Sequence, residues 1–118
     1  MSTPVGPYTP IVRAGEWLVV SGQVGIADGK LVPGGLEGEL RQAFVNLSSL
    51  LAGEGASLDD VTKTTVFLRH LASDYAKMNE VYMELFGEHR PARSAIGVAE
   101  LPVGALVEVE AWAYLGAG

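Results

Sequence analysis

The stretch PARSAIGVAELPVGALVEVEAWAY, residues 91–114, predicts two β-strands, at 93–98 and 105–115, around a loop at 99–104. One face of the second strand carries apolar side chains suited to contact with helices: Val107, Val109, Ala111, Ala113 and Leu115. The opposite face mixes apolar side chains with two carboxylates: Leu106, Glu108, Glu110, Trp112 and Tyr114. A monomer would leave this apolar patch in water, so we expect a partner subunit to cover it.

Further strands are expected in the first two thirds of the chain. Residues 18–24 predict a strand, and the Asp28-Gly29 turn after it indicates a hairpin. The run VTKTTVFL at 61–68 is rich in β-branched residues and predicts another strand.

Two helices are expected between these strands. Apolar residues at helical spacing predict a helix over 36–51 that stops at Gly53. Ser73 or Asp74 is expected to cap a second helix, which Gly87 closes. Its apolar face has five members: Tyr75, Met78, Tyr82, Leu85 and Phe86. Two helices on one face of a mixed β-sheet, an α+β fold, is the economical packing of these elements, in a single domain spanning residues 1–118.

Composition excludes several classes of function. The chain has 118 residues, 48% of them hydrophobic and 19% charged, which is typical of one folded domain. It contains no cysteine, and its two histidines lack metal-ligand spacing, so we expect no metal site. The net charge is −6 and the eight basic residues are scattered, which disfavours nucleic acid as a partner. No stretch approaches the roughly 20 apolar residues of a membrane span, and no signal peptide is recognisable, so we expect a cytoplasmic protein.

Arg93 is the main candidate for a functional residue. It shares a strand face with the small Ala95 and Gly97, which leave room for a pocket. If the two strands of the 91–114 stretch pair as a hairpin, Arg93 and the carboxylates fall on the same face. Arg93 is then either the structural ion-pair partner of Glu108 or Glu110, or a bidentate clamp on a substrate carboxylate. In the second case Glu108 polarises a water or moves a proton. The residues alone leave both interpretations open.

Two further segments are candidates for lining a site. Tyr8 lies between prolines in GPYTP, where a tyrosine ring most often covers the edge of a core. Ser21-Gly22-Gln23 offers a hydroxyl and backbone amides at a strand end, although such a triplet is most often a bulge.

Four motifs resemble those of one known family. They are GPYTP at 6–10, SGQ at 21–23, VTKTTVFLRHL at 61–71 and PARSAIGVAELPVGALVEVEAWA at 91–113. Over nearly its whole length the chain resembles the RidA/YjgF family of reactive-intermediate deaminases. The resemblance implies a chorismate-mutase-like fold, assembled as a homotrimer with a site at each subunit interface. It also implies hydrolysis of enamines and imines, such as 2-aminoacrylate and 2-iminobutyrate, to 2-keto acids and ammonia without a cofactor.

The resemblance also assigns roles by position. Arg93 would clamp the substrate carboxylate, and Glu108 would orient or activate a water beside the imine carbon. Tyr8, Ser21 and Gly22 would line the pocket.

The chain also departs from the family pattern. Ala95, beside the clamp, stands where many relatives carry a cysteine, and Gly97 where they often carry an acid. The loop at 87–90 is shorter than in well-known members. These departures leave the physiological imine open.

The alternatives come from other classes of protein. A trimeric module that binds small carboxylates without turnover would also retain Arg93. A ribonuclease, another activity attributed to relatives, is less compatible with a chain that has no basic groove.

Overall fold

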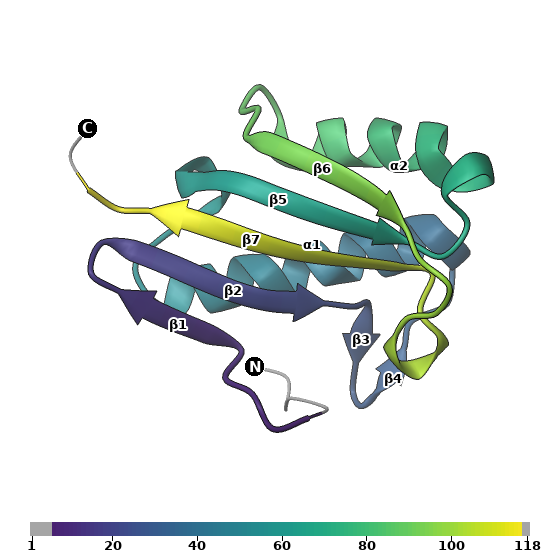
Figure 1. The fold of residues 1–118 in the computed structure, drawn as a ribbon, viewed down its shortest axis with the longest axis horizontal. Helices are drawn as coiled ribbons and strands as arrows, with labels where there is room; N and C mark the ends of the chain where they lie inside the picture. The colour runs from purple at the N-terminus through teal and green to yellow at the C-terminus, as the bar shows by residue number, and fades with distance from the viewer. Residues whose placement is uncertain (1–5, 117–118) are drawn as a thin grey trace.

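The computed structural model describes residues 6–116, in which two helices cover one face of a five-stranded sheet (Figure 1). The helices are α1 (Gly35–Gly53) and α2 (Leu71–Phe86). The sheet runs in the order β1 (Ile11–Ala14), β2 (Trp17–Gln23), β7 (Val107–Tyr114), β5 (Val61–Leu68) and β6 (Ala92–Gly97). Only β5 and β6 pair in parallel among these neighbours. The α+β class, with a mixed sheet and both helices on one face, is confirmed.

The hairpin at the Asp28-Gly29 turn is also confirmed. It joins β3 (Ile26–Ala27) to β4 (Lys30–Leu31) in a small separate sheet. Both turn residues have positive φ, 54° at Asp28 and 79° at Gly29, which an Asp-Gly pair tolerates well.

The first strand, β1, was not predicted from the sequence. It pairs with β2 across a two-residue turn at Gly15-Glu16, in which Gly15 takes a φ of 62°. Three of its four side chains are exposed, so the edge strand lacks the alternation by which a half-buried strand is recognised.

The expected hairpin between 93–98 and 105–115 is wrong. β5 lies between β6 and β7, with β6 parallel on one edge and β7 antiparallel on the other. The physical reason is α2, which connects β5 to β6 and, as a crossover helix, brings the next strand alongside in parallel. The remaining edge of β5 is then open to β7.

The helix predictions hold except at one cap. α1 includes the predicted 36–51 span and ends at Gly53, and α2 is closed by Gly87 with a φ of 69°. Ser73 and Asp74, however, lie inside the first turn of α2 rather than at its cap. The N-cap is His70, whose carbonyl accepts a hydrogen bond from Ser73 Oγ at 3.4 Å.

The core lies between the helices and the sheet. The inward face of β7 is fully buried against it: Val107, Val109, Ala111 and Ala113. At its centre the Thr64 and Tyr82 hydroxyls share a hydrogen bond of 2.7 Å, with both residues buried. Burial raises the pKa of Tyr82, and the Thr64 hydrogen bond offsets part of this effect, so the phenol stays neutral at physiological pH. This bond fixes the Tyr82 ring of α2 over β5.

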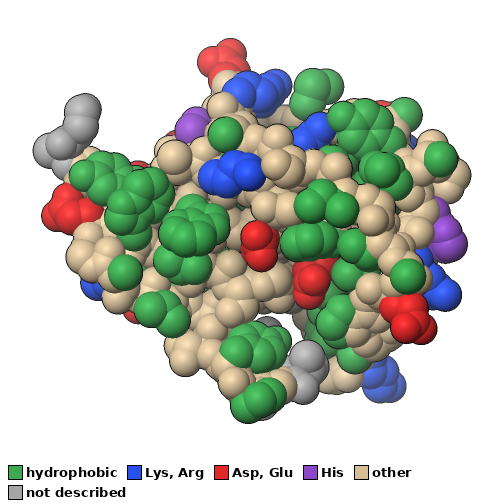
Figure 2. Space-filling model, in the orientation of Figure 1, with side chains coloured by type: hydrophobic (Ala, Val, Ile, Leu, Met, Phe, Trp, Pro, Cys, Tyr) green, Lys and Arg blue, Asp and Glu red, His purple; other side chains and the backbone are tan. Residues whose placement is uncertain are grey.

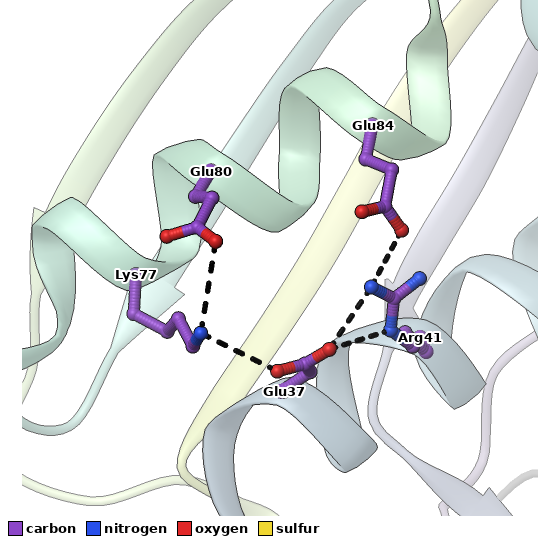
Figure 3. Close-up of polar contacts among 5 residues, drawn as sticks. All are labelled: Glu37, Arg41, Lys77, Glu80 and Glu84. Atoms are coloured by element: carbon purple, nitrogen blue, oxygen red, sulfur yellow. Dashed lines mark hydrogen bonds and ion pairs between the residues drawn. The ribbon is translucent and has the colours of Figure 1, made fainter.

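A surface network of ion pairs also joins the two helices (Figure 3). Arg41 of α1 binds Glu37 one turn earlier at 2.9 Å and also contacts Glu84 of α2. Lys77 of α2 reaches Glu37 at 3.5 Å and Glu80 at 3.8 Å. The hydrogen bond from Arg41, more than the nearby Lys77, lowers the pKa of Glu37. These charges are exposed, so they orient α2 against α1 more than they stabilise the fold.

Among the described residues, no helix combines the length and apolar character needed to cross a membrane.

We expect Thr64→Val to lower the free energy of unfolding by about 1–3 kcal/mol, because it leaves the buried Tyr82 hydroxyl without a partner. Urea denaturation measures this. The control is Thr62→Val on the same strand, at an exposed position, with an expected change within about 0.5 kcal/mol. Equal effects of the two variants would show that the buried hydrogen bond does not contribute to stability.

Candidate functional site

Arg93 points to the helix side of the sheet. In the parallel register it lies beside Thr64, whose side chain is buried under α2. Its guanidinium accordingly contacts three residues of α2 rather than the opposite face. Ala95 follows on the same face of β6 and packs against the core. The sequence correctly placed Arg93 and Ala95 together.

Aromatic and sulfur atoms surround the Arg93 guanidinium. Its carbon lies 4.9 Å from the centre of the Tyr82 ring and 5.7 Å from that of Tyr75. One terminal nitrogen donates to the Tyr75 hydroxyl at 3.2 Å and the other to Met78 Sδ at 3.5 Å. Within residues 6–116 no carboxylate lies within ion-pair distance of it. The side chain is held in place while most of its N–H groups remain available to an anion.

The guanidinium opens into a hollow of about 480 Å³ between α2 and β6. Its walls are Leu71, Ala72, Tyr75, Arg93 and Ala95. Among the described residues Arg93 is the one charged side chain in this lining, and the remaining walls are three aliphatic side chains and the Tyr75 ring.

Glu108 lies on the other face of the sheet. It pairs with Phe67 of β5, whereas the neighbouring pair Val66 and Val109 points into the core. Arg93 and Glu108 of one chain are therefore separated by the sheet. The interpretation of Arg93 as an ion-pair partner of Glu108 or Glu110 is wrong, because it depended on the hairpin.

Glu108 belongs to a second hollow, of about 410 Å³, which also contains Tyr8, Ser21 and Gly22. The sequence placed these four residues in one site, and the structure brings them together. The Ser21-Gly22 step is also a bulge, seen as a register shift between Val20 and Gln23. Ser21 holds the segment that carries Tyr8, because its hydroxyl donates to the Thr9 carbonyl at 2.8 Å.

The Glu108 carboxylate has an unusual environment. Burial raises its pKa, and the neighbouring Glu110 raises it further. Gly22 makes room for it, since a Cβ on Gly22 would lie 2.7 Å from Glu108 Cδ. Within residues 6–116 no hydrogen bond to this carboxylate is formed. A half-buried acid without a partner is suited to bind a water or to exchange a proton.

The face around Glu108 is apolar and exposed. Trp17 packs against Trp112 and Tyr114 at centroid distances of 6.2 and 4.8 Å. The side chain of Trp112 is nevertheless 44% exposed and that of Tyr114 38%. Figure 2 shows acidic side chains near the middle of this face with hydrophobic ones around them. This is the uncovered face predicted from the alternation in the last strand.

Several residues around Arg93 were not singled out from the sequence as parts of a site. Tyr75, which lines the hollow, and Tyr82, which contacts the guanidinium, were assigned to the apolar face of a helix, and Leu71 and Ala72 were given no role. The signal was the order strand, helix, strand over 61–98, which places the start of α2 beside the end of β6. Among the described residues, no three His, Asp or Glu side chains are grouped as metal ligands would be.

Known proteins similar to this chain share its fold. A family model described as endoribonuclease L-PSP matches residues 1–115. A RutC family protein of Pyrococcus horikoshii is 45% identical over 113 residues, which cover 94% of this chain and 89% of the relative. The 2-iminobutanoate/2-iminopropanoate deaminase of Mus musculus is 42% identical, with 95% and 84% covered.

Solved structures of similar proteins have the same fold as this chain. RidA from the Antarctic bacterium Psychrobacter has a TM-score of 0.91 at 38% identity, with 95% of this chain and 91% of that chain covered. TdcF of E. coli with bound serine has a TM-score of 0.89 at 34% identity, with 96% and 91% covered. The chorismate-mutase-like fold expected from the resemblance is thereby confirmed.

We expect Glu108→Gln to raise the melting temperature at pH 7. The folded-state pKa of Glu108 is raised, so the charged form carries a cost in the folded state that glutamine avoids. This cost is complete above the folded-state pKa and vanishes below the ordinary carboxyl pKa. Thermal unfolding at pH 7 and at pH 3.5 should therefore show the gain only at the higher pH. A stabilisation of the same size at both pH values would contradict the raised pKa.

Proposed function

Because the chain belongs to the RidA/YjgF family, whose model is described as endoribonuclease L-PSP, we propose that it hydrolyses 2-imino acids to 2-keto acids and ammonia. The observation that carries this proposal is the pair of complementary hollows. Within residues 6–116, one presents an Arg93 guanidinium that no carboxylate neutralises, and the other presents a Glu108 carboxylate that accepts no hydrogen bond. A small molecule with a carboxylate and an electrophilic carbon needs both groups.

Two copies of the chain form each site in this proposal. In one copy the sheet separates Arg93 from Glu108, so a substrate held by Arg93 meets the Glu108 of a neighbouring copy. Repeating this unequal contact around a closed ring gives three equivalent sites in a homotrimer. The exposed aromatic cluster of Trp17, Trp112 and Tyr114, on the same face of the sheet as Glu108, supplies apolar area for the contact.

The two charged groups have separate tasks. The planar guanidinium of Arg93 binds the substrate carboxylate through two parallel N–H bonds. The contacts with Tyr75 and Tyr82 hold it in the orientation for this binding. Tyr8, Ser21 and Gly22 line the wall that carries the acid. Binding thereby fixes the imine carbon near Glu108 of the neighbour.

Glu108 acts on the water. The water oxygen bonds to C2 of the imine, one of the water protons passes to the Glu108 carboxylate, and the imine nitrogen takes up a proton from solvent. In the second half of the reaction the amino group takes the proton that Glu108 held, the C–N bond breaks to release ammonia, and the hydroxyl returns its proton to solvent as it becomes the keto group. An enamine such as 2-aminoacrylate first gains a proton at C3 and loses one from its nitrogen to become the imine. General-base catalysis of this kind contributes typically about 10²–10⁴-fold in rate.

Cleavage of RNA fits the two hollows less well. Glu108 and Glu110 both lie in the second hollow, where they repel a phosphodiester, and the chain carries a net charge of −6.

The first test follows keto-acid release while a threonine or serine dehydratase generates the imine in situ. We expect the native chain to accelerate release and Arg93→Ala to abolish the acceleration. Arg93→Lys keeps the charge but loses the two-point grip, so its KM should rise by about tenfold or more. A folded native protein that binds 2-keto acids without accelerating release would instead be a carboxylate-binding module.

The shared site is tested by mixing two inactive variants. Arg93→Ala and Glu108→Gln should each be inactive alone. After they are unfolded and refolded together in equal amounts, about a quarter of the sites should combine an intact Arg93 with an intact Glu108 from the neighbouring copy. Activity is measured before and after mixing. If no activity returns while mixed oligomers form, the two residues do not act on the same substrate from different copies.

Gly22→Ala should displace the Glu108 carboxylate, because the new Cβ would lie within 3 Å of three Glu108 atoms. Those atoms belong to a flexible side chain, so we expect the protein to fold and kcat to fall by about 10²-fold or more as the base is lost. The matched control is Gly53→Ala at the end of α1, where an added Cβ meets nothing within 4 Å. Equal activity of the two variants would show that the position of Glu108 is not critical.

A further inference from the structure

Glu39 of α1 is the one charged side chain that lies buried in the described part of the chain. It is 6% exposed and belongs to a buried helix face that is otherwise apolar. Within residues 6–116 it forms no ion pair. A carboxylate is costly to bury unless its oxygens accept hydrogen bonds, so the group that donates to Glu39 indicates why an acid is there.

The partner of Glu39 is the start of the strand that carries Glu108. Glu39 Oε1 accepts a hydrogen bond from the Leu106 amide at 2.8 Å, two residues before Glu108. The pairing of β7 with β2 ends at Val109, so at Leu106 the helix supplies an acceptor that β2 does not reach. The Leu106 carbonyl in turn accepts a hydrogen bond from the Arg69 amide at 3.1 Å. Both backbone groups of Leu106 are therefore held.

α1 also holds another wall of the Glu108 hollow. Val24 lines this hollow, and its carbonyl accepts a hydrogen bond from Asn46 Nδ2 at 3.1 Å. Gly25 follows directly, and a Cβ on it would lie 2.5 Å from the Glu39 carbonyl oxygen. The loop after β2 thus rests on the backbone of the residue whose side chain holds β7. α1, which runs behind β2 and β7 in Figure 1, joins the two walls at Glu39.

We propose that Glu39 is a positioning residue for Glu108: its hydrogen bond to the Leu106 amide fixes the start of β7 and thereby the place of the Glu108 carboxylate. The inference rests on the proposed function, in which Glu108 takes the proton of the attacking water. Glu39 lines neither hollow, so it acts through the backbone of β7. A misplacement of about 1 Å can cost on the order of 10²-fold in rate.

The kinetic test compares Glu39→Met with Glu39→Gln. Methionine fills a similar volume but cannot replace the strong acceptor, so kcat should fall by about tenfold or more. KM should change by less than about twofold, because Arg93 still binds the substrate carboxylate. Glutamine keeps the Oε1 acceptor without the charge, so Glu39→Gln should retain kcat within about threefold. Keto-acid release from imines generated in situ measures both constants, with rates divided by the folded fraction from circular dichroism.

The control for a general loss of stability is Ser57→Ala. It removes the side chain that accepts a hydrogen bond from the Asp59 amide at 3.3 Å, away from both hollows. We expect it to weaken the fold and to leave kcat and KM as in the native chain. Three outcomes would overturn the inference: a folded Glu39→Met with native kcat, a Glu39→Gln as slow as Glu39→Met, or a Ser57→Ala as slow as Glu39→Met.

The position of Glu108 is also measured without turnover. Carbon-13 NMR of protein labelled at the glutamate carboxyls follows the titration of Glu108, whose signal is assigned by its loss in Glu108→Gln. Burial raises the pKa of Glu108, so a carboxylate displaced from this environment should titrate closer to the ordinary range. We expect this change in Glu39→Met and a native titration in Glu39→Gln.

This measurement separates the inference from the proposed function. If the native chain hydrolyses no imine, the proposed deaminase function fails, and the titration of Glu108 alone decides whether Glu39 positions it. An unchanged titration of Glu108 in Glu39→Met overturns the inference in either case.

Discussion

The pairing of β5 with strands on both edges is the constraint on which the rest of the structure depends. β5 presents Thr64 to the helices and Phe67 to the opposite side, because successive side chains of a strand alternate between faces. Arg93 pairs with Thr64 in the parallel register of β6, so its side chain lies on the same face of the sheet as that of Thr64. Glu108 pairs with Phe67 in the antiparallel register of β7, so its side chain lies on the same face as that of Phe67. The strand register alone therefore places the two charged side chains on opposite faces of the sheet, whatever contacts they make.

Each charged residue is then kept available by its neighbours. Aromatic rings support the guanidinium of Arg93 without neutralising it, since burial raises the pKa of Tyr82 and keeps it an uncharged phenol. Among the described residues no Lys or Arg lines the hollow of Glu108, and Glu110 lies beside it. Within residues 6–116 neither Arg93 nor Glu108 forms an ion pair, which favours a ligand or a neighbouring copy as their partner.

The sequence predicted the helices and strands themselves better than it predicted which strands pair with one another. The periodicity of 36–51 and of 105–115 indicated a helix and a strand correctly, because many side chains on one face of each are buried. Strand pairing was wrong because a short loop at 99–104 suggests a hairpin, whereas the choice was made by the crossover through α2. The edge strand β1 buries too little to leave a pattern.

For the candidate site, too, the sequence identified residues but not their arrangement in space. Its residues were found from motifs, yet the motifs did not reveal that Arg93 and Glu108 lie on different faces. Tyr75 and Ala72 were missed because a helix that lines a hollow has the same spacing as a helix that covers a core.

The separation of Arg93 from Glu108 has a consequence for the life of the chain after synthesis. In the proposed assembly a newly folded, solitary copy holds two incomplete halves and is chemically inert. Activity then rises more steeply than protein concentration as copies associate, and it is lost on dilution without unfolding. In that assembly each copy contributes Arg93 to one site and Glu108 to another, so a damaged copy that still assembles impairs two sites. In this proposed assembly the working unit is the contact between copies rather than the single chain.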